Sequence, residues 1–348
     1  MSVPYDETVL TSKTAEPARQ DGRPAARAAL GAACISSSAI LVTLAHAGPA
    51  TTAFYRCVLA LPVLVPLAVA EQRRRGARSR ENRLYALLAG LFLAVDLVLW
   101  NHAIADVGAG VATVLGNLQV LFVGVLAWLV LKERPNRRFL TMLPVVFVGV
   151  VLVSGAVGGS TAGLAPTAGI GFGLATSAAY AVFLLTMRQK AGSGGHVAGQ
   201  LADATAGAAA GSLLLGLAFG GFQFRLAPAS LGWLLMLALL SQTAGWLLIT
   251  SSLPQLPAAL SSLLLLLQPA AAMVLADIIL GQRPTLLQVA GALLVCGGVL
   301  AVAWVRSGRH REQDVAVAEP GGDGMAAQPR VGYRDGELDA QHGGEVCV

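Results

Sequence analysis

The sequence predicts an all-α polytopic membrane protein in which ten transmembrane helices form two inverted five-helix repeats. Of its 348 residues, 55% are hydrophobic and only 12% are charged, whereas a soluble domain has about 25% charged residues. Two joints between apolar runs, "LVLKERPNRR" (129–138) and "IILGQRPTLL" (278–287), align residue for residue at an offset of 149. The basic residues also collect on one side of the predicted spans. Together these observations predict the fold class.

The apolar runs between residues 26 and 305 are long enough to cross a bilayer as helices. A hydrocarbon core of about 30 Å needs about 20 helical residues. The runs are continuous in Leu, Ala and Val, whereas the strands of a membrane β-barrel would alternate between apolar and polar residues. The predicted spans are 27–46, 51–70, 84–104, 109–131, 139–157, 168–188, 198–219, 230–250, 257–280 and 286–305.

The distribution of Lys and Arg predicts the orientation of these spans. With the N-terminus in the cytoplasm, 21 of the 24 Lys and Arg residues fall in cytoplasmic loops and tails. The exceptions are Arg225 and Arg283 in outer loops and Arg56 inside the second span. Cytoplasmic loops of membrane proteins carry an excess of basic residues, so both termini are expected in the cytoplasm. The same rule accounts for the net charge of +5, and no nucleic-acid partner is predicted.

The two copies of the joint indicate that the second repeat is inverted. The first copy carries Lys132, Arg134, Arg137 and Arg138, whereas the second keeps only Arg283. Because five is odd, the second repeat enters the membrane from the opposite side, and its joint faces outward. The expected division is an N-terminal tail (1–25), two repeats (26–157 and 168–305) and a disordered C-terminal tail (306–348). Such inverted repeats are common among secondary transporters.

The first span has a second interpretation. Three arginines precede an apolar run that ends in "AHAG" (45–48), which resembles a signal-peptidase site. The run is long for a signal peptide, and an acidic, polar stretch precedes it. An uncleaved first helix is therefore favoured.

At the offset of 149, spans four and nine align Val120 with Pro269 and Glu133 with Gln282, and in each copy the two positions are thirteen residues apart. The second copy, "LLQPAAAMVLADIILGQRPT", has Pro269 but Gln282 in place of the Glu. The first copy, "NLQVLFVGVLAWLVLKERPN", has Glu133 but Val120 in place of the Pro. At the helix ends, Glu133 and Gln282 are expected to set the geometry of the joints.

With "FYRCVLALPVL" (54–64) and the ten-span count, these motifs make residues 26 to about 305 resemble the EamA family of the drug/metabolite transporter superfamily. The resemblance implies a secondary transporter that moves a small metabolite, amino acid or drug-like solute by alternating access, mostly outward. It also implies a cavity between the repeats, lined mainly by spans 1, 3, 4, 6, 8 and 9. The expected partners are that solute and the lipid bilayer, with the plasma (inner) membrane of a bacterium as the location. Proton coupling and a homodimer are left open.

Two ionisable residues lie at similar depths inside neighbouring spans. An ionisable group at the centre of a transmembrane helix costs about 2.5–3.5 kcal/mol or more. Arg56 and Asp96 lie roughly six and eight residues from the outer ends of their spans, which at about 1.5 Å per residue differ by only a few ångström. They are predicted to pair, directly or through water. A structural ion pair is favoured over a gate or a proton-linked pair.

Polar residues near the middle of the membrane are the candidates for substrate binding. Gln119 and Gln268 are equivalent at the offset of 149, and an amide that both donates and accepts suits a neutral or zwitterionic solute. Pro269 lacks a backbone donor and leaves a carbonyl free. Further candidates, most of them four residues from another polar residue, are Trp100, Tyr180, Gln242 and Trp246. The alternative for each is interhelical hydrogen bonding or an interfacial aromatic ring.

A membrane-embedded enzyme and a non-transporting scaffold are the two alternatives to a transporter. A membrane-embedded enzyme would need a nucleophile, a metal cluster or paired carboxylates. The spans offer only isolated acids and two histidines, His46 and His102, while the four cysteines show no paired spacing. No disulfide, metal or cofactor is predicted, and the lack of a phosphate-binding loop argues against ATP-driven pumping. A non-transporting scaffold is compatible with the composition, but inverted repeats favour transport because they supply two related states.

Overall fold

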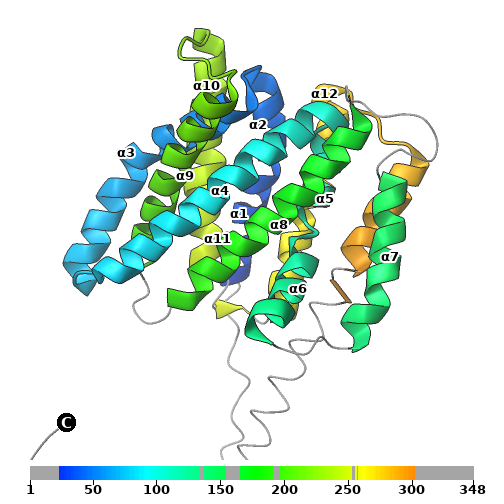
Figure 1. Ribbon diagram of the computed structural model, residues 1–348, viewed down its shortest axis with the longest axis horizontal. Helices are drawn as coiled ribbons and strands as arrows, with labels where there is room; N and C mark the ends of the chain where they lie inside the picture. The colour runs from blue at the N-terminus through cyan, green and yellow to red at the C-terminus, as the bar shows by residue number, and fades with distance from the viewer. Residues whose placement is uncertain are drawn as a thin grey trace, which may run out of the picture. The chain divides into compact units, whose positions relative to one another are not determined.

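The computed structural model describes residues 23–132, 137–153, 165–190, 196–252, 255–256, 258–298 and 300–301. Within this part of the chain the secondary structure is helical and no strand occurs (Figure 1). The first half contains α1 (Arg23–Ser36), α2 (Ser38–Ala45), α3 (Pro49–Arg75), α4 (Arg80–Val107), α5 (Ala109–Gly116), α6 (Gln119–Leu131) and α7 (Arg137–Val153). The second half contains α8 (Pro166–Lys190), α9 (Val197–Phe219), α10 (Pro228–Met236), the π-helix η1 (Leu237–Gly245), α11 (Trp246–Ser252), α12 (Ala258–Leu280) and an unlabelled helix, Leu286–Gly298.

Seven helical stretches among the described residues are long and apolar enough to cross a membrane. They are Arg23–Ala45, Pro49–Arg75, Arg80–Val107, Ala109–Leu126, Pro166–Met187, Val197–Phe219 and Pro228–Ser252. Shorter apolar stretches of α7 (Leu140–Val153), of α12 (Gln268–Leu280) and of the last helix (Leu286–Gly298) lie within the predicted spans five, nine and ten. Helical segments therefore occupy all ten predicted ranges, and seven of them meet the length requirement by themselves.

Three spans that the sequence predicts as continuous are interrupted. The first breaks at Ser37, whose hydroxyl donates to the carbonyl of Cys34 at 2.7 Å. The fourth breaks at Asn117 and Leu118, between α5 and α6, and the Asn117 amide donates to the carbonyl of Thr113 at 2.8 Å. Short polar side chains that bond to nearby carbonyls compete with the helix ladder and bend it. Each of these two spans is therefore made of two helices, α1 with α2 and α5 with α6.

The third interruption is the π-helix η1, in the middle of the eighth predicted span. Thr243 donates its hydroxyl to the carbonyl of Ala238, five residues earlier, at 2.9 Å. A helix of this kind has a wider turn than an α-helix and often occurs at functional sites. Gly245 is the last residue of η1 and packs tightly against α1. A Cβ added to it would lie 2.7 Å from the side chain of Ile35. The tight contact with α1 accompanies the departure from α-helical geometry.

Close approach between small residues holds the long helices together. The helix α4 packs along α8 and α9, and α3 packs along α9 (Figure 1). A Cβ added to Gly207 would lie 2.2 Å from the carbonyl oxygen of Leu87, and one added to Gly90 would lie 2.2 Å from that of Ala204. The backbones of α4 and α9 therefore touch, as small-residue spacings in membrane helices allow.

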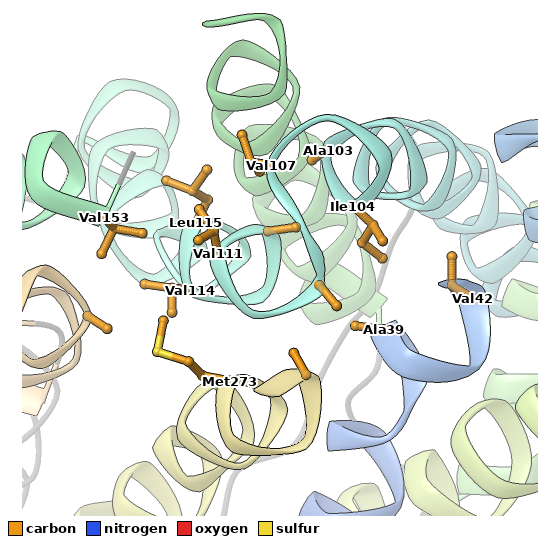
Figure 2. Packing of buried hydrophobic residues seen from close by; sticks show 14 of the residues in the cluster. Ala39, Val42, Ala103, Ile104, Val107, Val111, Val114, Leu115, Val153 and Met273 are labelled. Carbon is orange, nitrogen blue, oxygen red and sulfur yellow. The ribbon is translucent and has the colours of Figure 1, made fainter. Parts of the chain in front are cut away.

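The largest apolar cluster joins helices from both halves of the chain. Figure 2 shows Met273 of α12 pointing toward Val114 of α5, with Val107 of α4 and Val153 of α7 nearby. Spans four and nine thus contact each other through α5 and α12. Many large apolar side chains are instead exposed on the outer faces of α3, α4 and α9, such as Leu214, which is 64% exposed. A surface of this kind suits a lipid environment.

Candidate transport site

A buried arginine occupies the centre of a polar cluster. Arg56 of α3 is only 5% exposed. Its Nε donates to Oε1 of Gln242 at 2.7 Å, Nη1 to Oγ of Ser38 at 3.2 Å and Nη2 to Oγ of Ser241 at 3.4 Å. Hydrogen bonds to a charged group are stronger than neutral ones, and they offset part of the cost of burying the guanidinium.

Gln242 connects this cluster to a fourth helix, α9. Its Oε1 accepts from Arg56, and its Nε2 donates to Oγ1 of Thr205 on α9 at 3.1 Å. Gln242 is 1% exposed, and both ends of its amide are engaged. A role in substrate binding stays a prediction. Gln242 links α3 of the first half to η1 and α9 of the second.

The predicted direct pair between Arg56 and Asp96 is not formed. Neither residue takes part in the salt bridges that Asp203 forms with Arg78 and Arg83. Asp96 of α4 is 6% exposed, and its carboxylate has no hydrogen bond to another described side chain. The two charges are nevertheless within electrostatic reach of each other. Neutral oxygens of spans one and eight bind the guanidinium in this structure, and pairing with Asp96, directly or through water, stays a prediction.

An aromatic cluster adjoins the two charges. The rings of Tyr180 and Phe183 on α8 are 5.4 Å apart, and Trp246 of α11 lies 6.2 Å from Tyr180 and 6.0 Å from Phe183. Tyr180 is also within electrostatic reach of Arg56 and Asp96. The sequence singled out Tyr180 and Trp246 separately, and the structure brings these two side chains together.

The break in the fourth span is supported by α8. Ser177 donates its hydroxyl to the carbonyl oxygens of Leu115 and Gly116 at 2.7 and 3.0 Å. Gly116 lies beside the indole of Trp100, since a Cβ there would be 3.8 Å from the Trp100 ring. Gln119 is the first residue of α6, directly after the break, and it is half-buried.

Gln268, which is equivalent to Gln119 at the offset of 149, lies inside a helix rather than after a break. Gln268 is half-buried in α12, one residue before Pro269, and the helix continues through this proline. Neither side-chain amide has a hydrogen bond to another described residue. The structure therefore places both residues within spans that contact each other. Glu133 lies outside the described residues.

Gln282 has a specific contact at the joint. Its Oε1 accepts a hydrogen bond from the backbone N–H of Ala109, the first residue of α5, at 3.0 Å. The first N–H groups of a helix have no partner within it, so this side chain caps α5. Gly108 turns the chain from α4 into α5 with a φ of +88°, which glycine adopts without strain. A hollow of about 30 Å³ beside Gln282 has room for water but not for a metabolite.

Sequence reasoning overlooked several members of this site. Thr205 is equivalent to Arg56 at the offset of 149. Ser241 and Gln242 are two adjacent polar residues within the apolar eighth span, and this pattern could have identified Ser241. The roles of Ser177 and Phe183 depend on contacts between distant spans, and no local signal marks them.

Both ends of α3 are also tied to the second half of the chain. At one end, Arg78 forms a salt bridge with Asp203 of α9, and Glu71 accepts from the N–H of Gly199 at 2.9 Å. At the other end, Thr51 accepts from the N–H of Gln223 at 2.9 Å, and Tyr55 donates to the carbonyl of Phe224 at 3.2 Å. The polar cluster around Arg56 lies between these two attachments.

The fold and the site define a class, a multi-pass helical membrane protein whose two halves meet at a buried polar cluster. The family model of the EamA-like transporters matches this chain twice, over residues 25–155 and 167–304. The chain belongs to the EamA-like transporter family. It is thus a membrane transporter of the drug/metabolite type, whose partners are the lipid bilayer and a small-molecule substrate.

Comparisons with individual proteins add the fold only. A solved structure titled "Crystal structure of protein" is similar over 82% of this chain and 99% of its own, with a TM-score of 0.57 and 17% identity. At that identity the likeness extends to the architecture and not to a substrate. A search of curated proteins finds no match.

Proposed function

We propose that this protein is a secondary transporter that exports a small amphipathic metabolite, amino acid or drug-like compound by alternating access. The chain spans the plasma membrane of a bacterium ten times, with both termini in the cytoplasm. The strong asymmetry of Lys and Arg supports this topology. The inversion of the repeats supplies two related conformations between which the substrate site changes its access.

The observation that carries this proposal is the buried polar cluster between the two repeats. Arg56 is held by Ser38 of its own repeat and by Ser241 and Gln242 of the other. Ionisable groups inside a membrane protein are costly and commonly line substrate or ion pathways. If this position served packing alone, apolar residues would fill it at a lower desolvation cost than a buried arginine.

The substrate is proposed to bind next to this cluster. Tyr180 and Trp246 offer amphipathic rings for an apolar or aromatic group, and Trp100 lies close to the break in span four. Gln119 and Gln268 are proposed to face the same cavity from opposite repeats. An amide that faces lipid would have no partner, so both should turn toward protein or water.

Transport assays on glutamine variants test this site. Metabolite profiles of deletion and overexpression strains first identify a transported solute. We then expect Gln119→Leu and Gln268→Leu to reach the membrane at parental levels and to transport that solute at least about tenfold more slowly, as the loss of one or two polar contacts predicts. Gln72→Leu, an exposed glutamine at the end of α3, is the matched control. If both variants transport the solute at the parental rate and affinity, these two glutamines do not form the substrate site.

Asp96 and Arg56 are proposed to act as a coupled pair, with a structural role favoured over that of a gate or a proton-linked pair. The motive is a buried carboxylate within electrostatic reach of a buried guanidinium but without a direct bond to it. A double-mutant cycle with Arg56→Ala and Asp96→Ala measures their coupling in transport. Because a shared electrostatic interaction is lost only once, the double variant should lose less than the two single variants together. If the effects of the two single substitutions on transport are strictly additive, Arg56 and Asp96 are not coupled.

A further inference from the structure

One face of α3 carries an open groove away from the transport site. The groove has a volume of about 510 Å³ and is lined by Val65, Pro66, Val69, Ala70, Arg73 and Arg74. These residues repeat at a spacing of four, so they form one stripe along the helix. All six are exposed, whereas Leu64, beside the stripe, is fully buried against the core. The groove therefore faces outward from the protein.

The basic end of the groove has no partner within the described part of the chain. Arg73 and Arg74 form no hydrogen bond or salt bridge with another described residue. The acid nearest in sequence, Glu71, is already bound to the N–H of Gly199, and Asp203 is bound to Arg78 and Arg83. Two guanidinium groups therefore lie at the end of an apolar groove, and no carboxylate of the described residues forms a salt bridge with either of them.

The dimensions of the groove match one leaflet of a bilayer. From Val65 to Arg73 the helix rises about 12 Å, and half of a hydrocarbon core is about 15 Å. An occupant would therefore place an acyl chain along the valines and a phosphate beside the arginines. Guanidinium groups bind phosphate oxygens through two parallel hydrogen bonds.

We propose that this groove binds an anionic phospholipid, with its phosphate at Arg73 and Arg74 and one acyl chain along Val65, Pro66 and Ala70. A lipid with net negative charge is favoured over a zwitterionic one, because the latter brings a headgroup cation toward the two arginines. Basic clusters at the cytoplasmic ends of transmembrane helices recognise anionic lipids in this way.

Native mass spectrometry of the full chain, purified with equal amounts of phosphatidylglycerol and phosphatidylcholine, tests this proposal. We expect the parental protein to retain phosphatidylglycerol preferentially. Arg73→Gln with Arg74→Gln should lower that preference by about 30-fold, which corresponds to about 1 kcal/mol for each arginine. Ala70→Trp, which fills the groove but keeps the charges, should release the lipid as well.

The control removes the same charge elsewhere on the chain. Arg27→Gln with Arg80→Gln changes two exposed arginines at the starts of α1 and α4, and it should keep the parental lipid preference. Equal retention of the two lipids by the parental protein overturns the proposal. So does parental retention in the Arg73/Arg74 variant or in Ala70→Trp, and so does an equal loss in the control, which would indicate attraction by net charge alone.

Discussion

At the scale of residues, Arg56 shows why a buried charge is easier to find than its partners. An arginine inside an apolar span signals a polar environment, and depth alone made Asp96 its expected partner. The guanidinium instead donates to Gln242, Ser38 and Ser241. Sequence spacing places residues along one helix, but it does not show which distant helices are neighbours. The location of the polar site was therefore predictable, whereas its hydrogen-bond partners were not.

Gln282 shows the converse case, in which a local motif points to a residue that has a specific contact in the structure. The sequence assigned it to joint geometry, and the structure supplies the atom that it contacts, the N–H of Ala109. The motif usually has a Glu at this position. A carboxylate would accept the same hydrogen bond, and its charge would also interact favourably with the positive N-terminal end of α5.

We expect opposite effects from two substitutions of Gln282. Gln282→Leu should destabilise the protein by about 1 kcal/mol, because it leaves the Ala109 N–H without its cap. Gln282→Glu should retain the cap and add about 0.3–1 kcal/mol. Thermal unfolding in one detergent measures both, with Gln72→Leu as the control for loss of an exposed amide. Identical unfolding temperatures for all variants would show that the cap contributes nothing.

At the scale of elements, the sequence predicted where the helices lie but not where they break. Long apolar runs dominate hydropathy, so one or two polar residues such as Ser37 or Asn117 hardly alter it. Their effect depends on whether the side chain bonds to a nearby carbonyl, as both do here. The π-helix η1 has no comparable sequence signal, because it accompanies the contact between Gly245 and α1.

The contact between α4 and α9 provides a prediction at this scale. Gly207→Ala would place a methyl group 2.2 Å from the carbonyl oxygen of Leu87, so the helices must separate. Overpacking of this kind costs about 1–3 kcal/mol. Gly171→Ala in α8 has nothing within 4 Å of the new methyl group, and it should stabilise the helix by about 0.5–1 kcal/mol.

Unfolding temperatures of the two variants should therefore move in opposite directions. Both remove a helical glycine and add one methyl group, so any difference reports the space around it. A stable, fully folded Gly207→Ala protein would mean that α4 and α9 do not approach as closely as the structure indicates.

At the scale of the whole molecule, α3 connects the two repeats along its entire length. It contacts the second half through Thr51 at one end, Arg56 in the middle and Glu71 at the other end. The sequence predicted two repeats of one architecture from the offset of 149, and the family match covers both. It did not predict these contacts between the repeats, because neither repeat contains both partners.

The central claim, that the two repeats lie in the membrane in opposite orientations, is tested most directly at two equivalent positions. Arg134 and Arg283 occupy the same place in the two joints. In a protein without its native cysteines, Arg134→Cys and Arg283→Cys are exposed in intact cells to a maleimide that cannot cross the membrane. We expect Cys labelling at 283 alone, and labelling at 134 only after the cells are permeabilised. Labelling of both positions from outside, or of 134 alone, would contradict the inverted arrangement.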